Sequence, residues 1–371
     1  MVELILALVG ASLVAASIAA NQPWLDRHFL PSFVINRAWY LRIEIGIRIV
    51  VACIGVTLAL IARRRVARLV VDRRDQILPV AIAVTLACAA GEAVLQRRGL
   101  RPAEWLLPGE EPRRQPDAVL GWTLVPNRTG HLSIGGRTVD YAVNPLGYRA
   151  RSTTETLDVS RPTIVFSGES IIFGEGLTFD ESIPEQTGAM LGVRAANLGV
   201  NGFSTDQSFL RLRQELPRFQ RPTAVVSIFM PILFGRNLDD DRPHLGPGLT
   251  WTPAARHARL VSLARLFVPY RSDETIARGI VLTRDVLRAT ADLARTRGAV
   301  PLLIVPQVGP EDPTETDLRL RVLDEGHVPY LPVPLDARWT VEPADRHPDA
   351  RGARAIAAAI AATCASSKGC R

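Results

Sequence analysis

Three long apolar stretches lie in the first part of the chain. Residues 2–20, 41–62 and 77–95 are apolar along most of their length. A helix of about 20 apolar residues is long enough to cross the hydrocarbon core of a bilayer. We therefore predict a membrane region at residues 1–98 with about three transmembrane helices.

From about residue 161 the pattern changes to short β-branched runs that alternate with longer amphipathic segments. Such alternation is typical of an α/β fold with a parallel sheet. The expected strands are 163–166, 195–198, 224–229, 301–305 and 328–331, and the expected helices are 181–191, 205–216, 273–297, 315–325 and 350–363.

The segment between these two regions has its own composition. Residues 99–117 are rich in Pro, Arg and Glu, which predicts a linker. Residues 118–160 place Gly and Pro turn signals between short alternating runs, which predicts a small β-rich extension. The main α/β domain is then expected at residues 161–371.

Charge adds information about topology. The formal net charge is +7, and the arginines are scattered or lie beside apolar stretches, without the aromatic-interleaved basic stripe of a nucleic-acid module. The densest cluster, residues 63–74, lies between the second and third stretches and is expected in the cytoplasm by the positive-inside rule. Everything after residue 95 is then expected outside, although the arginines at residues 97–114 favour the opposite orientation.

The cysteines and histidines bear on compartment and metals. Cys53 and Cys88 lie inside apolar stretches, whereas Cys364 and Cys370 bracket a short C-terminal loop. A disulfide between that second pair would require an oxidising compartment such as the periplasm, and the sequence leaves its formation open. The six histidines are dispersed and no Cys/His spacing suggests zinc, so we expect no metal and no cofactor.

One stretch carries a candidate nucleophile. A short apolar strand at 163–166 is followed by Ser167-Gly168-Glu169-Ser170 and then by two further glycines. Open α/β sheets bind ligands beyond the carboxyl ends of their strands, where this hydroxyl is expected. Ser170 is therefore the predicted nucleophile, although Gly-x-Ser alone is also common in ordinary turns.

A second stretch supplies the groups that a serine nucleophile requires. Asp345 and His347 stand two residues apart, just before an alanine-rich helix. A base must take the serine proton, and an acid must orient that base and stabilise its positive charge. The Gly-x-Ser-x-Gly elbow of α/β-hydrolases is absent, because Ile172 occupies the position of its last glycine.

Together these motifs resemble the SGNH or GDSL-type hydrolases, which are flavodoxin-like three-layer α/β/α enzymes. The first family block looks like Gly168-Glu169-Ser170-Ile171, with Glu in place of the usual Asp. The fourth block looks like Asp345 and His347, with one residue between them instead of two. The resemblance runs from about residue 115 to the end and includes the segment 143–149, which is similar to one that precedes the serine strand in many membrane-linked members.

The two middle blocks imply an oxyanion hole. The second block looks like the segment 197–202 and implies that the N–H groups of Ser170 and Gly202 hold the oxyanion. The third block normally carries an Asn after the third strand, and Asn237 is the amide available here.

The resemblance implies a serine esterase or O-acyltransferase. Together with the apolar stretches and the arginine distribution, it predicts an enzyme anchored in a bacterial inner membrane with a periplasmic catalytic domain. Its substrates would be ester-linked acyl or acetyl groups, as in cell-envelope carbohydrate. The expected partners are this acylated substrate, the lipid bilayer and membrane proteins of polysaccharide assembly. One alternative is a non-catalytic carbohydrate-binding scaffold on a degenerate hydrolase fold, and another is an accessory subunit of a membrane acyltransferase.

Overall fold

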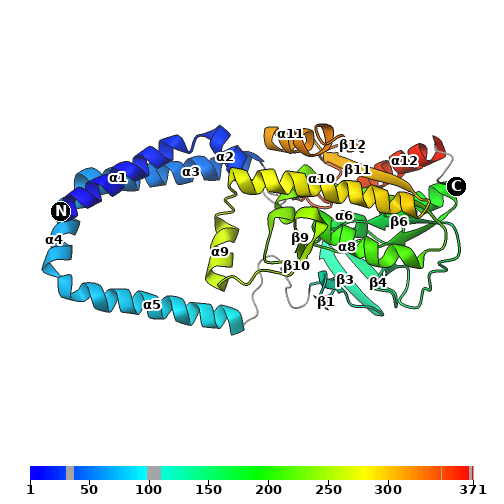
Figure 1. The fold of residues 1–371 in the computed structure, drawn as a ribbon, viewed down its shortest axis with the longest axis horizontal. Coiled ribbons are helices and arrows are strands. Elements are labelled where there is room, and N and C mark those ends of the chain that lie inside the picture. Colours follow the sequence, from blue (N-terminus) through cyan, green and yellow to red (C-terminus); the bar gives the residue numbers. More distant parts are fainter. Residues whose placement is uncertain (31–36, 98–109, 344, 367–369, 371) are drawn as a thin grey trace. The chain divides into compact units, whose positions relative to one another are not determined.

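The computed structural model describes residues 1–30, 37–97, 110–343, 345–366 and 370. The chain divides into two units (Figure 1). The first comprises Met1–Leu30, Ile35–Pro102 and His257–Arg271, and the second comprises Pro31–Val34, Ala103–Arg256 and Ser272–Arg371. The predicted domain at 161–371 therefore contributes one short segment to the first unit.

The first unit is helical throughout its described elements, which are α1 (Val2–Ala19), α2 (Gln22–His28), α3 (Arg37–Val56), the π-helical η1 (Thr57–Ala62), α4 (Arg63–Asp72), α5 (Arg74–Arg97) and α9 (Arg259–Phe267). Three continuous helical segments are long and apolar enough to cross a membrane, namely Val2–Ala19, Arg37–Asp72 and Arg74–Arg97. They cover the three apolar stretches that the sequence shows, except that α1 ends one residue before the first stretch does. The arginine cluster lies mostly in α4.

Helices α1 and α3 contact each other through glycine. A Cβ added to Gly10 would lie 2.6 Å from the carbonyl oxygen of Gly55, and a Cβ added to Gly55 would lie 2.7 Å from that of Gly10. Small residues allow helix backbones to approach this closely, which is how many membrane helices pack.

The second unit is built on an eight-stranded sheet of order β12-β11-β8-β6-β7-β5-β4-β3. The pairs β6–β7, β6–β8, β8–β11 and β11–β12 are parallel, and the remaining pairs are antiparallel. The strands are β3 (Arg128–Ile134), β4 (Arg137–Val143), β5 (Arg149–Ala150), β6 (Thr163–Ser167), β7 (Arg194–Asn197), β8 (Pro222–Ile228), β11 (Val300–Val308) and β12 (Leu331–Leu335).

The predicted β-rich extension is thus continuous with the main sheet. Its strands β3, β4 and β5 extend the sheet beyond β7, where Arg149 pairs with Asn197. Two small hairpins lie outside the large sheet: β1 (Arg114–Asp117) pairs with β2 (Gly121–Leu124), and β9 (His244–Leu245) pairs with β10 (Trp251–Thr252).

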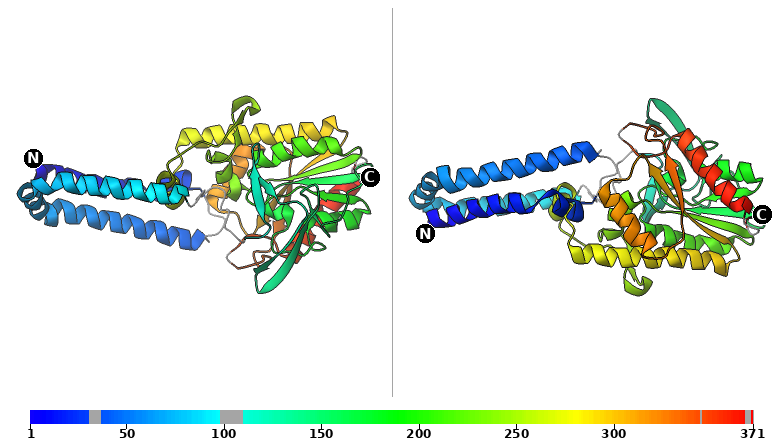
Figure 2. Two further views of the ribbon diagram at one scale, coloured as in Figure 1. Left: turned by 90° about the horizontal axis from the view of Figure 1, so that it is seen from below. Right: turned by 90° about the horizontal axis from the view of Figure 1, so that it is seen from above.

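Helices cover both faces of the parallel strands. Figure 2 shows α10 (yellow) and α12 (red) on opposite sides of the sheet. The helices and short turns of this unit are α6 (Ser170–Phe173), α7 (Ile183–Leu191), α8 (Thr205–Glu215), η2 (Leu216–Arg218), η3 (Pro231–Leu238), η4 (Pro247–Leu249), α10 (Asp273–Thr296), α11 (Pro313–Arg319), η5 (Leu320–Asp324) and α12 (Ala350–Ser366).

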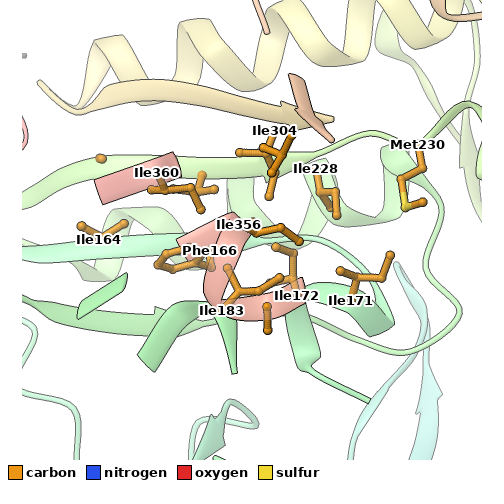
Figure 3. Packing of buried hydrophobic residues seen from close by; sticks show 14 of the residues in the cluster. Ile164, Phe166, Ile171, Ile172, Ile183, Ile228, Met230, Ile304, Ile356 and Ile360 are labelled. Atoms are coloured by element: carbon orange, nitrogen blue, oxygen red, sulfur yellow. The ribbon is translucent and has the colours of Figure 1, made fainter. Parts of the chain in front are cut away.

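Strand β6 contributes to the hydrophobic cores on both faces of the sheet, and all of its side chains are buried. Alternate residues of a strand face opposite sides of the sheet. Phe166 packs with Ile356 and Ile360 of α12 (Figure 3), whereas Val165 packs in the cluster of the other face with Leu212 of α8. The predicted α/β/α fold with a parallel sheet is confirmed.

Candidate active site

Ser170 lies in the first turn after β6, and glycine makes this turn possible. A Cβ on Gly168 would lie 2.4 Å from Cγ1 of Ile172 and 2.6 Å from Cγ2 of Ile228, so no larger residue fits there without displacing its neighbours. Glu169 caps the short helix α6, because its Oε2 accepts a hydrogen bond from the N–H of Ile171 at 3.1 Å. The serine is therefore held at the carboxyl end of the central strand.

The segment after β7 is fixed directly to this turn. Asn197 donates from Nδ2 to the carbonyl of Ile172 at 2.9 Å and accepts from the N–H of Gly199 at 2.9 Å. Val200 donates its N–H to the carbonyl of Gly168 at 3.1 Å. The second sequence block is thus hydrogen-bonded to the first, as expected if both contribute to one site.

Two backbone N–H groups at this junction have no acceptor in the described part of the chain: those of Ser170 and Gly202. Gly202 adopts a φ of 82°, a left-handed conformation that side chains disfavour. These are the two donors that the sequence assigns to the oxyanion hole. Unpaired N–H groups of this kind are available to a developing negative charge.

Ser170, His347 and Asp345 are joined by hydrogen bonds. The Nε2 atom of His347 lies 2.7 Å from Oγ of Ser170. Its Nδ1 atom lies 2.7 Å and 2.8 Å from the two carboxylate oxygens of Asp345. The ring is buried, with a residue exposure of 8%. The three side chains chosen from the sequence therefore form a continuous chain of donors and acceptors.

The loop that carries His347 is anchored on both sides. The carbonyl of His347 accepts from the N–H of Val341 at 2.9 Å. The side chain of Arg346 forms an ion pair with the buried carboxylate of Glu315 in α11. Glu315 is itself held by a reciprocal capping box with Asp312. Arg346, the residue between Asp345 and His347, thus anchors the loop to α11.

Two further carboxylates lie close to the catalytic candidates. Oε2 of Glu169 accepts the hydroxyl proton of Ser170 at 2.5 Å. Oε2 of Glu175 lies 3.8 Å from Nε2 of His347 and also accepts from the side-chain amide of Asn201. From the sequence alone, Glu169 is assigned no catalytic step and Glu175 no role.

These carboxylates change the acidity of the histidine. Burial by itself lowers the pKa of His347, but the charge of Glu175 and the hydrogen bond and charge of Asp345 outweigh it. With a further contribution from Glu169, the pKa rises to about 9. The pKa of Asp345 is lowered despite its burial, because His347 hydrogen-bonds to it.

The hydrogen bonds of Ser170 agree with a protonated histidine. A hydroxyl has one proton, and here Ser170 donates it to Glu169. Nε2 of His347 then donates to Ser170, as an imidazolium does. This arrangement suits the protonated ring that the raised pKa of His347 favours. Deprotonation of His347 converts it to an acceptor.

Asn237 is not brought to the nucleophile. Its Oδ1 accepts from the N–H of Thr205 at 2.9 Å, and its Nδ2 donates to the hydroxyls of Thr205 and Thr283 at 3.1 and 3.0 Å. This amide therefore joins η3 to α8 and α10. The preceding residue, Arg236, has its Nη1 atom 3.9 Å from Oε2 of Glu169.

The space around the site is small. A depression of about 170 Å³ beside His347 is lined by Ile171, Gly174, Glu175, Leu177, Ile183 and Pro348. A second space, of about 310 Å³ including open solvent, is lined by Glu169 together with Phe203, Ser204, Thr205, Ser208, Ile228, Phe229, Met230 and Leu233. Both are at or below the size of sites for drug-sized ligands.

Among the described residues, no group of three or more His, Cys, Asp or Glu side chains is arranged to hold a metal ion. Cys364 and Cys370 are both buried, and a hydrogen bond to Cys370 together with burial raises the pKa of the Cys364 thiol. The two sulfur atoms are therefore neighbours, as their spacing in the sequence allows.

Comparison with known proteins gives structural neighbours only. No family model matches the chain, and no curated protein matches it. A lipolytic protein of the G-D-S-L family from Desulfitobacterium hafniense is 14% identical over 54% of this chain and 98% of its own, with a TM-score of 0.35.

Two carbohydrate esterases give similar values. An acetyl xylan esterase from Butyrivibrio proteoclasticus is 13% identical over 56% of this chain and 64% of its own, with a TM-score of 0.33. A family 2 carbohydrate esterase from Corynascus thermopiles is 15% identical over 58% and 68%, with a TM-score of 0.32. At such values, any function must come from the atoms of this chain's own site.

Proposed function

We propose that this SGNH-hydrolase-like domain is a serine esterase or O-acyltransferase that acts on small ester-linked acyl groups. The observation that carries the proposal is the 2.7 Å separation between Oγ of Ser170 and Nε2 of His347, with Asp345 bound to the other ring nitrogen. A buried serine, histidine and carboxylate in this order form the arrangement that activates a hydroxyl for acyl transfer.

The first half-reaction follows from these positions. His347, once neutral, accepts the proton of Ser170 while Oγ bonds to the carbonyl carbon of the ester. The π-electron pair of the carbonyl moves to its oxygen, which accepts hydrogen bonds from the N–H groups of Ser170 and Gly202. The C–O bond to the alcohol then breaks, and His347 returns its proton to the leaving oxygen. The product is an acyl-Ser170 ester and a free alcohol.

The second half-reaction regenerates the serine. Water, or a hydroxyl of an acceptor sugar, gives its proton to His347 and attacks the acyl carbon. The bond to Oγ breaks as the tetrahedral intermediate collapses, and Ser170 recovers a proton from His347. Water gives hydrolysis and a sugar gives O-acyl transfer, so the nature of the second nucleophile separates the two activities.

The size of the site favours a short acyl group. Ile171, Leu177 and Ile183 close the space beside His347 to the depression of about 170 Å³. The side chains around this space already lie close together, so an acetyl group would displace them less than a long acyl chain would. We therefore propose acetyl esters, of the kind carried by cell-envelope carbohydrate, as the substrate class.

The helices of the first unit support a membrane location. Three segments have the length and composition of membrane spans. The arginines of α4 favour the cytoplasm for the connection between the second and third spans. We accordingly propose a multi-pass inner-membrane protein whose α/β domain faces the periplasm, beside the assembly of an acylated polysaccharide.

The full-length protein in detergent tests this function. Ser170-dependent hydrolysis of p-nitrophenyl acetate, with much slower hydrolysis of the octanoate ester, is the expected result. A sugar acceptor that diverts the acetyl group from water would identify the protein as a transferase. Binding of acetylated carbohydrate by a folded protein without Ser170-dependent turnover would instead support the non-catalytic scaffold. Co-purification with a multispanning acyltransferase would support the accessory-subunit alternative.

A further inference from the structure

The end of strand β8 lacks a polar side chain where an oxyanion donor is expected. The four residues after β8 are Phe229, Met230, Pro231 and Ile232, and all four are buried. None of these side chains can donate a hydrogen bond from nitrogen or oxygen. Asn237, further along, is committed to Thr205 and Thr283. The proposed oxyanion hole therefore has only its two backbone donors from these elements.

The side chain of Arg236 lies close to both segments of the proposed oxyanion hole. Its Nη1 atom lies 3.4 Å from the carbonyl oxygen of Phe203 and 3.9 Å from Oε2 of Glu169. Phe203 follows Gly202 in the chain, and Glu169 precedes Ser170. The guanidinium thus lies between the two segments that present the N–H groups of the oxyanion hole.

The remaining donors of this guanidinium are available. Arginine carries five N–H donors. In the described part of the chain, Nε and Nη2 of Arg236 have no hydrogen-bond partner, and the side chain is 26% exposed. At 3.9 Å the ion pair with Glu169 is longer than a hydrogen bond. The guanidinium is therefore held near the site, while its Nε and Nη2 groups can still donate hydrogen bonds to a substrate.

We infer that Arg236 is a catalytic residue that donates to the oxyanion of the tetrahedral intermediate, as the third member of the oxyanion hole. This inference rests on the proposed esterase function and deepens it. Loss of one oxyanion donor in a hydrolase typically lowers kcat by about 10²–10³-fold. Because the negative charge develops only during attack, the loss is expected in kcat and not in KM.

The structural alternative is that Arg236 only balances the buried charge of Glu169. A double-mutant cycle separates this role from donation to the oxyanion. The variants are Arg236→Met, Glu169→Gln and the two combined, assayed as full-length protein with p-nitrophenyl acetate. We expect Arg236→Met to lower kcat by about 10²–10³-fold with KM changed less than about threefold. The double variant is expected to be no faster than Arg236→Met alone.

Arg236→Lys guards against a folding defect. Lysine keeps a positive charge near Glu169 but lacks the planar fork of donors, so it is expected to keep the melting temperature and lose most of kcat. The inference is overturned if Arg236→Met stays within about threefold of wild type. It is equally overturned if the double variant recovers the rate of Glu169→Gln. If wild type shows no Ser170-dependent turnover, the esterase function itself fails, and this inference fails with it.

Discussion

Oε2 of Glu175 lies 3.8 Å from Nε2 of His347, on the side of the ring that faces Ser170. A serine hydrolase needs its histidine neutral before attack, because only the neutral ring accepts the serine proton. A carboxylate at this position stabilises the imidazolium instead. Glu175 is therefore expected to raise the pH at which the proposed esterase becomes active.

The first prediction concerns the pH dependence of the reaction. Since the pKa of His347 is raised to about 9, kcat/KM is expected to rise with pH and level off above about 9. Glu175→Gln removes the negative charge but keeps an acceptor for Asn201, so its profile is expected to shift to lower pH. Steady-state rates between pH 6 and 10 measure both profiles.

A charge change elsewhere serves as the control for that shift. Glu274 lies in α10 with a side chain that is 80% exposed. Glu274→Gln is expected to keep the wild-type profile. Coincident profiles for Glu175→Gln and wild type would show that Glu175 does not set the pKa of His347.

The same histidine links pH to stability with the opposite sign. Its pKa is about 9 in the folded protein against 6.5 as the ordinary value, so the folded state holds the proton more tightly. This stabilisation is fully present below pH 6.5 and is lost as pH rises through 9. It amounts to about 3 kcal/mol. We expect the melting temperature of wild type to fall more steeply over this interval than that of His347→Gln, and equal slopes would contradict the argument.

The ion pair between Arg346 and Glu315 is expected to position the histidine loop. Arg346→Met removes the anchor from a residue between Asp345 and His347, so kcat is expected to fall by about 10–10²-fold through misplacement of the ring. Arg351→Met is the matched control, because Arg351 pairs with Asp349 in the same region and its side chain is 63% exposed. Equal rates for the two variants would show that the loop needs no such anchor.

Packing of α1 against α3 is expected to require glycine at the position where the two helices approach most closely. Gly55→Ala places a methyl group 2.7 Å from the carbonyl oxygen of Gly10 and 2.9 Å from Cγ2 of Val14. Overpacking of this kind costs about 1–3 kcal/mol. Gly46→Ala, in the same helix, meets no atom within 4 Å and is expected to be neutral. Melting temperatures in detergent compare the two variants. Equal melting temperatures for Gly55→Ala and Gly46→Ala would contradict a close helix contact at Gly55.

The parts of the site that the sequence predicts are those carried by local motifs. Ser170 follows a strand whose pattern is unambiguous, and Asp345 and His347 stand together before a helix. The 2.7 Å contact between His347 and Ser170 spans 177 positions, yet the alternating pattern already places both segments at one edge of a parallel sheet. Local pattern and topology, together with the resemblance to SGNH hydrolases, were enough to pair them.

The parts that the sequence does not predict depend on side-chain direction. Asn237 has the residue type expected for the third block, but η3 turns its amide toward Thr205 and Thr283. Arg236 beside it points toward Glu169 instead. No spacing rule separates two neighbouring residues in an irregular turn, so this assignment required coordinates.

Long-range pairing was also beyond the sequence pattern. The alternating runs at 118–160 predict strands, but the single pairing of Arg149 with Asn197 is what joins them to the main sheet. Glu175 is a similar case. It lies five residues after Ser170, and its effect on His347 depends on a distance in space that no local periodicity encodes.

The most direct test of an activated serine is covalent labelling of the full-length protein with a fluorophosphonate. Ser170→Ala and His347→Ala are compared with wild type and with Ser167→Ala. Ser167 is a buried serine at the end of β6 that donates to the carbonyl of Ser208. We predict one label per chain on Ser170, no label in Ser170→Ala, slow labelling in His347→Ala and wild-type labelling in Ser167→Ala. A folded wild-type protein that takes no label, or a Ser170→Ala variant that labels as fast as wild type, would contradict the assignment of Ser170 as the nucleophile.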